Sequence, residues 1–409
     1  MSTTATIDAG EGDAGGPAGR PGTGAEVVAR LRAAGQALLL PALALLTALV
    51  VGGLVIVFSN PDTLNQWGDF FRDPSQALRS SWDAVFDSYR ALWDSSLATP
   101  SALGRTLVES TPLALAGLSV ALAFRAGLFN IGAAGQLIVG ATCAGWVGFT
   151  FDLPTAVHLP LAVMAGAAGG AAWGAIAGFL KARFGAHEVI TTIMLNYISY
   201  RLLDYALRST AFQRPGRNDP ISKPVHESAR LPEITAGDMR VHAGLFIALA
   251  AAVAVWWLLG RSTVGFRMRA VGTNPFASRY AGMKVGATYM LSMAIAGGLA
   301  GLAGTSNILG RPSFSLTGGF YAEIGFDAIA VALLGRANPF GVLAAAFLFG
   351  VLRAGSTGMQ AATQTPVDII IVIQALIILF VAAPRLVRAI YRVPAGRGAE
   401  QRFTTSWGA

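Results

Sequence analysis

Charged residues are scarce in this chain of 409 residues, in which 13% of the side chains are charged and 54% are hydrophobic. Soluble domains carry about twice that share of charge. Charge-free runs occur at 33–61, 126–151, 153–180 and 285–310, and each is long enough for the roughly 20 residues that cross a bilayer as a helix. The sequence therefore excludes an ordinary soluble domain and predicts several membrane-spanning helices.

Lysine, cysteine and histidine are also rare. The three lysines, Lys181, Lys223 and Lys284, lack the neighbours of a phosphate-binding loop, so the chain has no ATP-hydrolysing motif of that kind. The single cysteine, Cys143, can form no internal disulfide, and the four histidines are too widely spaced for a zinc site. We therefore expect no metal, no cofactor and no enzymatic site in this chain.

The net charge of +8 does not indicate a nucleic-acid partner, although basic chains often bind phosphate backbones. The basic residues separate the hydrophobic runs instead of gathering on one polar face, and such residues favour the cytoplasmic side of membrane proteins. An amino terminus inside the cell places most of them there, so we expect both termini to be cytoplasmic. The predicted cytoplasmic groups are Arg30 and Arg32, Arg125, Lys181 and Arg183, the cluster from Arg261 to Lys284, Arg336, and Arg385 to Arg392.

Ten hydrophobic segments fit the chain best, which predicts an all-α, polytopic membrane protein. The eighth and ninth segments are shorter than a full crossing, so they are predicted to be broken or tilted helices. The ten segments are 35–58, 104–124, 127–150, 154–180, 189–207, 242–260, 286–308, 322–335, 338–354 and 366–384.

The rest of the chain is predicted to consist of tails and loops around this transmembrane domain at 35–385. Residues 1–25 have too little apolar content to fold and, like 393–409, are expected to be a cytoplasmic tail. The segments 59–103 and 208–240 are predicted to be external loops, and 261–285 a cytoplasmic one. The first of these contains aspartates with aromatic residues between them, which is typical of an interfacial segment.

Glycine is abundant, at 49 residues, and part of it is ordered. Gly166, Gly170, Gly174 and Gly178 recur at every fourth position, which removes side chains from one face of a helix and allows a second helix to approach closely. A shorter version of the pattern occurs at 297–301. These glycines predict helix packing and not a substrate site.

Polar side chains within the predicted spans are candidates for a substrate pathway. Gln136 with Asn130 in the third span, and Thr192 with Asn196 in the fifth, lie among apolar residues. Such groups either line a pathway or make hydrogen bonds between helices, and the residue pattern leaves both alternatives open. Asp327 is the strongest candidate charge, because a carboxylate in a membrane is costly and needs a partner.

Two basic residues, Arg336 and Arg125, are candidate partners for Asp327. Another acid, Glu109, stands four residues after Arg105, so these two are predicted to form a local pair on one helix.

Four blocks of sequence follow in order between about 100 and 355: RTLVESTPLALAGLSVALAFRAGLFNIGAAGQLIVG from Arg105, HEVITTIMLNYI from His187, GFRMRAVGTNPFASRYAG from Gly265 and GFDAIAVALLGRANPFG from Gly325. They resemble permease subunits of bacterial ABC importers of the branched-chain amino acid, ribose and nucleoside class, and within it the nucleoside and simple-sugar permeases. One position departs from the pattern, because many relatives have an acid where this chain has Ala134.

The resemblance implies a permease in the cytoplasmic membrane of a bacterium that moves a nucleoside or simple sugar. It implies four kinds of partner: an ABC ATP-binding subunit, a second permease subunit forming a heterodimer, an extracellular substrate-binding lipoprotein and membrane lipid. A proton-coupled secondary transporter is the alternative, with Asp327 or Glu323 carrying the proton. No constellation of acid, base or metal ligands supports a membrane-embedded enzyme.

The 261–285 segment is short, basic and patterned. Its proline is placed to open a short helix, and by resemblance this helix couples the permease to the ATPase. A loop that only sets the topology is the alternative, which explains the arginines but not the glycine pattern. The residues assigned to coupling are Arg267, Arg269, Gly272, Asn274, Pro275, Phe276, Tyr280 and Gly282.

Overall fold

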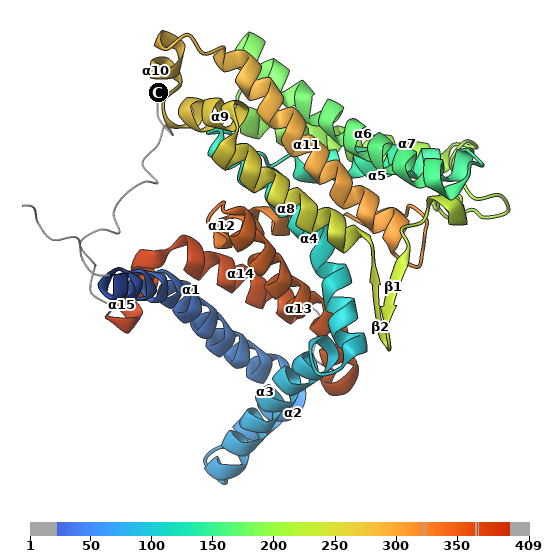
Figure 1. The fold of residues 1–409 in the computed structure, drawn as a ribbon. Helices are drawn as coiled ribbons and strands as arrows, with labels where there is room; N and C mark the ends of the chain where they lie inside the picture. The colour runs from blue at the N-terminus through green and yellow to red at the C-terminus, as the bar shows by residue number, and fades with distance from the viewer. Residues whose placement is uncertain (1–22, 322–323, 365, 367, 393–409) are drawn as a thin grey trace, which may run out of the picture.

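The computed structural model describes residues 23–321, 324–364, 366 and 368–392. Within these ranges the chain forms a bundle of helices with one two-stranded hairpin (Figure 1), which confirms the predicted all-α membrane fold. The helices are α1 Thr23–Ser59, α2 Pro61–Gly68, α3 Pro74–Ser96, α4 Pro100–Arg125, α5 Ala133–Thr150, α6 Thr155–Phe184, α7 Glu188–Arg208, α8 Gly244–Arg261, α9 Thr263–Thr273, α10 Pro275–Tyr280, α11 Val285–Gly310, α12 Ile324–Leu334, α13 Pro339–Thr363, α14 Asp368–Ala382 and α15 Pro384–Tyr391.

Each of the ten predicted spans corresponds to a helix, namely α1, α4 to α8 and α11 to α14. By length and composition, seven of the described helices could cross a membrane alone, and an eighth if α14 and α15, which meet at 92°, form one bent span. The two that remain are α7, which carries four charged residues, and α12, which has 11 residues. The predicted tails lie outside the described residues, except that 23–25 begin α1.

The eighth and ninth predicted spans differ from each other in the structure. At 1.5 Å per residue, α12 extends only about 16 Å, so it covers part of a membrane, as expected. In contrast, α13 continues to Thr363, nine residues beyond the predicted end at 354, and is long enough to cross. The prediction of a short ninth helix was wrong because Arg353 and the small and polar residues after it lower the local hydropathy without ending the helix.

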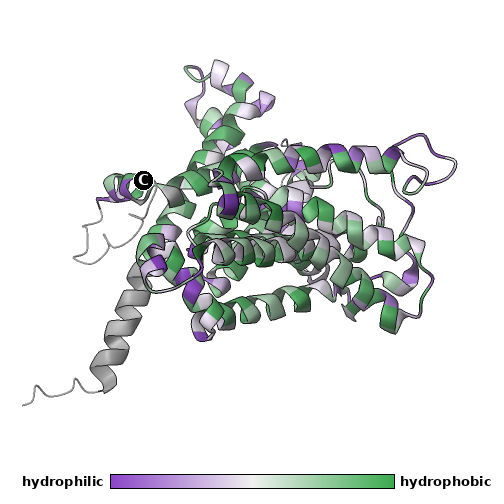
Figure 2. Cartoon of the chain, turned by 90° about the horizontal axis from the view of Figure 1, so that it is seen from above, coloured by the Kyte–Doolittle hydropathy of each residue, from purple (hydrophilic) through white to green (hydrophobic). Residues whose placement is uncertain are grey.

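The core of the bundle surrounds α4, in which every residue from Ser110 to Ala123 is buried. This helix contacts α8, α11, α12 and α13. A second hydrophobic cluster joins α1 and α14, and α13 contributes to both clusters. In Figure 2 apolar residues follow the helices of the bundle, and hydrophilic residues are more frequent in the segments that connect them.

The two long segments predicted to be external loops are partly ordered into regular structure. The first contains α2 and α3. Each of these helices begins with a proline, and the side chains of Asn60 and Asp73 cap their N-termini. The second contains strands β1 Glu233–Ala236 and β2 Met239–His242, which pair antiparallel around a two-residue turn. In Figure 1 this hairpin lies at one end of the bundle, and α9, α10 and α15 lie at the other.

Three helices meet at glycines, as the periodic pattern predicted. The glycine face of α6 packs on α11, where a Cβ atom added to Gly297 would overlap the carbonyl oxygen of Gly170. Gly140 of α5 meets Gly166 and Gly301 at a second close approach. Side chains are therefore excluded where α5, α6 and α11 cross, and backbone contacts hold the three helices together.

We expect Gly297→Ala to destabilise the protein by about 1–3 kcal/mol, because the added methyl group overpacks this crossing. The matched control is Gly298→Ala on the next residue of α11, where the added Cβ would meet Ala167 O at 3.5 Å and Ala171 Cβ at 3.6 Å, both ordinary contacts. Thermal unfolding of the detergent-solubilised protein measures the difference. Equal midpoints for the two variants would contradict the packing argument.

Candidate functional site

The predicted polar pair of the third span forms a closed amide pair. Asn130 Nδ2 donates to Gln136 Oε1 at 2.9 Å, and Gln136 Nε2 donates back to Asn130 Oδ1 at 3.1 Å. Asn130 also accepts from the backbone N–H of Gly132 and contacts Ser119 Oγ. Both amides are buried, so their hydrogen-bonding groups are satisfied within the chain.

The predicted polar residues of the fifth span face α5. Asn196 Oδ1 accepts from the backbone N–H of Gly135 at 2.8 Å, and its Nδ2 donates to Ile131 O at 3.0 Å. The first turn of a helix leaves its N–H groups without partners, so Asn196 of α7 caps α5 from a neighbouring helix. Thr192 is buried beside Gly132, and its hydroxyl donates to Glu188 O. These contacts support fastening of α5 to α7, and a pathway role for the four residues stays a prediction.

Asp327 forms an ion pair with Arg353 of α13 and with neither of its predicted partners. Arg353 Nε and Nη2 lie 3.1 and 2.9 Å from Asp327 Oδ2, and each side chain is 13% exposed. Arg125 instead donates to Ala337 O, and Arg336 is exposed in a turn with φ of 52°. The predicted partners are wrong because α12 packs its first turn against α13, which places Arg353 nearer than either of them.

Glu109 is likewise paired across helices. Its carboxylate lies 2.6 Å from Nη2 of Arg311 at the end of α11, while Arg105 donates to Ser95 O. The predicted local pair of Arg105 and Glu109 is therefore wrong: tertiary packing overrides the spacing of four residues. The side chains of Glu109 and Arg311 are 25% and 29% exposed.

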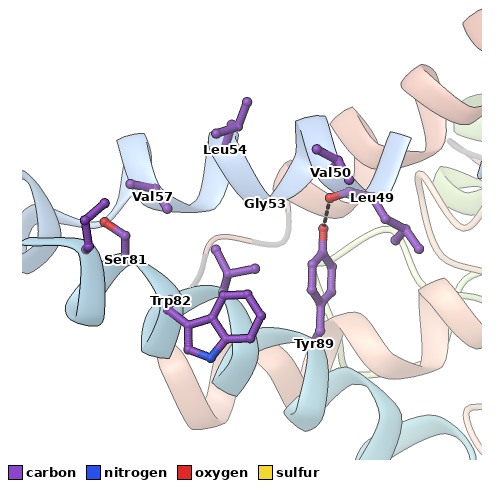
Figure 3. Close-up of a pocket in the computed structure, with 10 residues that line it drawn as sticks. Leu49, Val50, Gly53, Leu54, Val57, Ser81, Trp82 and Tyr89 are labelled. Atoms are coloured by element: carbon purple, nitrogen blue, oxygen red, sulfur yellow. Dashed lines mark hydrogen bonds between the residues drawn. The ribbon is translucent and has the colours of Figure 1, made fainter. Parts of the chain in front are cut away.

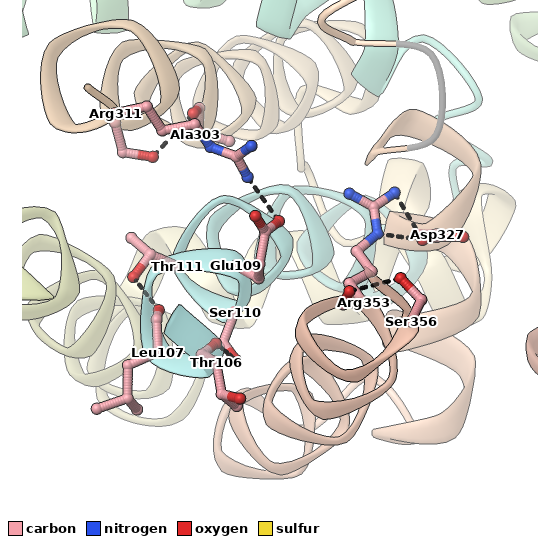
Figure 4. A network of polar contacts seen from close by, with 11 residues as sticks. Thr106, Leu107, Glu109, Ser110, Thr111, Ala303, Arg311, Asp327, Arg353 and Ser356 are labelled. Carbon is pink, nitrogen blue, oxygen red and sulfur yellow. Dashed lines mark hydrogen bonds and ion pairs between the residues drawn. The ribbon is translucent and has the colours of Figure 1, made fainter. Parts of the chain in front are cut away.

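Both ion pairs lie on one side of the α4–α13 pair. Figure 4 shows Glu109 and Arg353 pointing to the same side of these two helices, away from Thr106 and Ser110. On α13, Thr357 and Gln360 follow Arg353 on the same helix face, Gln364 comes directly after the helix, and all three are exposed. We call this set the polar wall; it comprises Glu109, Arg311, Asp327, Arg353, Thr357, Gln360 and Gln364.

The polar wall extends from inside the bundle to one end of it. Arg353 lies about 21 Å along α13 from Pro339, and the helix ends about 37 Å from Pro339. Asp327 is on α12, which reaches only part of the way through the bundle. Polar and charged side chains at such depth rarely face lipid and instead face protein or a water-filled path. The wall is therefore expected to face protein or water and not lipid.

A groove between α1 and α3 has a different character (Figure 3). Apolar side chains line it, and its two hydroxyl groups are engaged within the chain: Tyr89 donates to Leu49 O at 2.6 Å, and Ser81 Oγ accepts from Trp67 Nε1. The indole N–H of Trp82 is the other side-chain polar group of the lining, so the groove offers little to a hydrophilic solute, and we do not assign a transport role to it. The lining residues are Leu49, Val50, Gly53, Leu54, Val57, Leu78, Ser81, Trp82, Val85 and Tyr89.

The segment assigned to coupling forms two short helices at one end of the bundle. Asn274 caps α10 by accepting from Ala277 N, and Pro275 opens the helix as predicted. Phe276 and Tyr280, one turn apart on α10, are 66% and 94% exposed. The segment thus presents two aromatic side chains that no described part of the chain covers.

The other residues assigned to coupling support this segment. Gly272 packs against the backbone at Arg125 and Gly127, and Gly282 adopts φ of 78°, a conformation that favours glycine. Arg269 donates to Leu259 O, and Arg267 is exposed.

The sequence did not identify five residues of the polar wall, either as ion-pair partners or as pathway candidates. Arg353 lay at the end of a predicted span, and its helical spacing with Thr357, Gln360 and Gln364 was the available signal. Arg311 had no local signal, because its partner is 202 positions away. Glu323, an alternative proton carrier, lies outside the described residues.

We expect Asn196→Leu to lower the stability of the protein by about 1 kcal/mol, which is the typical loss for a missing helix cap. The variant should show a lower thermal midpoint and accumulate less in membranes. Met194→Leu, a change at an exposed position one half-turn away, is the matched control and should behave as the wild type. Normal stability with abolished uptake would favour the pathway role instead.

Comparison with known proteins gives consistent matches over most of the chain. The family model described as "Branched-chain amino acid transport system / permease component" matches residues 102–382. The guanosine ABC transporter permease protein NupP of Bacillus subtilis is 41% identical over 355 residues, which cover 86% of this chain and 94% of that protein. No solved structure matches.

Two further relatives carry different names. The glucose ABC transporter permease protein TsgB13 of Haloferax volcanii is 34% identical, over 86% of this chain and 89% of that protein. The nucleoside ABC transporter permease protein NupB of Lactococcus lactis is 38% identical, over 72% and 82%. With a family model that matches well over half of its length, this chain belongs to the branched-chain amino acid transport system permease family and is a permease subunit of an ABC importer.

Proposed function

We propose that this permease imports a nucleoside or a simple sugar, and that the polar wall lines one side of the pathway. The arrangement of the wall is the observation that carries the proposal: two carboxylate–guanidinium pairs and a row of polar side chains share one side of α4 and α13. A neutral, hydroxyl-rich cargo can exchange hydrogen bonds with such groups without adding net charge. The names of the relatives, which specify guanosine, nucleosides and glucose, support this class of cargo.

A second permease subunit would complete the pathway. Gln360 and Thr357 are exposed in the single chain, and a polar surface of this kind is costly against lipid. We propose a different, related permease chain in that place, so that the transport unit is a heterodimer. An extracellular substrate-binding lipoprotein would deliver the cargo at the end of the bundle that carries the β1–β2 hairpin, which is then the outer end.

The energy would come from ABC ATP-binding subunits at the opposite end. This chain has no phosphate-binding loop, so it needs a contact through which another subunit drives it. The exposed aromatics of α10 suit such a contact, because buried aromatic anchors dominate many protein interfaces. Exposed basic residues beside them, including Arg267 and Arg279, fit a cytoplasmic position for α9 and α10. Both termini would then be cytoplasmic.

The buried amides belong behind this pathway. Gln136, Asn130 and Asn196 direct their polar groups to each other and to the backbone of α5. They would hold α5 and α7 in place, whereas Asp327 and Arg353 would face the cargo.

The source of energy separates this proposal from a proton-coupled carrier. In cells that express this permease with its partner subunits, guanosine uptake should continue after a protonophore is added, as long as the ATP level is maintained. Uptake should stop when ATP is depleted while the proton gradient persists. Asp327→Asn supplies a second criterion, since proton coupling through this carboxylate would make uptake by the wild type, but not by the variant, depend on the external pH. Immediate arrest by the protonophore would favour the carrier.

Removing the aromatic anchors of α10 should weaken the ATPase contact. Each lost anchor removes about 2 kcal/mol or more, so binding of the ATP-binding subunit should fall roughly 30-fold in Phe276→Ala or Tyr280→Ala and by up to roughly 700-fold in the variant that carries both changes. Copurification and cargo-stimulated ATP hydrolysis measure this, with insertion into the membrane unchanged. Trp82→Ala, which removes an equally exposed aromatic from α3, is the control. Normal ATPase binding by the double variant would show that α10 is not the coupling element.

A further inference from the structure

The pair of Glu109 and Arg311 has the features of a binding subsite within the polar wall. The carboxylate and guanidinium lie 2.6 Å apart, and 25% and 29% of their side-chain surfaces are exposed. In the Asp327–Arg353 pair each side chain is only 13% exposed. A solute can therefore reach Glu109 and Arg311 without displacing a helix. Glu109 lies about 24 Å along α4 from Arg125, well within the bundle.

Two donors beside this pair have no partner in the described part of the chain. Arg311 Nε and Asn307 Nδ2 are buried and donate no hydrogen bond there. Asn307 lies in the last turn of α11, four residues before Arg311, and is 7% exposed. An unpaired buried donor is unfavourable, so its presence beside an accessible ion pair points to a ligand that supplies the acceptor.

The chemistry of the three side chains matches two adjacent hydroxyl groups. A carboxylate accepts hydrogen bonds from two hydroxyls at once, and guanidinium and amide groups donate to hydroxyl oxygens. The three groups together recognise a ring that both donates and accepts. Guanosine, other nucleosides and glucose all contain such a sugar ring, whereas their remaining parts differ.

We propose that Glu109, Arg311 and Asn307 form a subsite for two adjacent hydroxyls of the sugar ring of the cargo. This inference rests on the proposed nucleoside or sugar cargo. It goes further in assigning recognition of the sugar to the permease itself, on residues that the sequence did not identify as pathway candidates. The Glu109–Arg311 pair then has two tasks, because it joins α4 to α11 and exchanges hydrogen bonds with the passing solute.

The test compares guanosine with 2′-deoxyguanosine, which lacks one of the two adjacent hydroxyls. Uptake is measured in membranes that contain the complete importer with one unchanged binding protein, so that a difference between variants comes from the permease. Glu109→Gln should lower guanosine uptake at least tenfold and 2′-deoxyguanosine uptake much less, so the ratio of the two rates falls. Arg105→Gln, one turn away on the exposed face of α4, should leave the ratio unchanged.

Asn307→Ala provides a variant that should fold normally, because the amide that it removes donates to no described group. It should accumulate as the wild type does and still lower guanosine uptake.

A double variant, Glu109→Arg with Arg311→Glu, keeps opposite charges between α4 and α11 but misplaces the carboxylate. The subsite predicts that its uptake ratio stays low.

Three results would overturn the subsite. They are an equal loss for both solutes in Glu109→Gln, full recovery of the ratio in the charge-swapped double variant, and unchanged guanosine uptake in Asn307→Ala. Full recovery of the uptake ratio would show that the Glu109–Arg311 pair only joins α4 to α11. A wild-type importer that moves neither guanosine nor glucose would instead contradict the proposed function, so the two failures are distinguishable.

Discussion

Backbone contact between α5, α6 and α11 is the interaction on which the rest of the bundle depends. Lipid tails are as apolar as leucine side chains, so helices in a membrane gain little from burying apolar surface and rely on close packing. At Gly140, Gly166 and Gly301 the three backbones approach until no Cβ atom fits between them. This crossing positions α11 against α4 and so brings Arg311 within reach of Glu109.

The polar groups of the bundle divide into two sets by what surrounds them. Asn130, Gln136 and Asn196 are buried and satisfy one another or the N-terminus of α5. The ion pairs of the polar wall keep part of their surface exposed. A buried charge without a partner would be strongly unfavourable, so the wall can hold four charges only as two pairs. The same pairing leaves oxygen and nitrogen atoms available to a neutral cargo.

Local patterns in the sequence predicted most of the helices but few of the contacts in the polar wall. Hydrophobic length located ten helices, spacing of four residues located the glycine contacts, and Pro275 located α10. The partners of Glu109 and Asp327 are 202 and 26 positions away, and they depend on how helices are arranged rather than on any local rule. The end of α13 was missed for a related reason: hydropathy falls both where a helix leaves the membrane and where it faces a polar path.

The helix α11 links the proposed ATPase contact at α10 to the polar wall through one continuous helix. It begins five residues after Tyr280 of α10 and ends at Gly310, directly before Arg311 of the wall, a length of about 39 Å along its axis. Packed helices respond to force by small sliding movements, and the glycine crossing at its middle contains no interlocked side chains that would resist them. In the proposed mechanism, a displacement of α10 by an ATPase would be transmitted along α11 to the Glu109–Arg311 pair. The glycines that allow the helices to pack closely would then also allow α11 to slide.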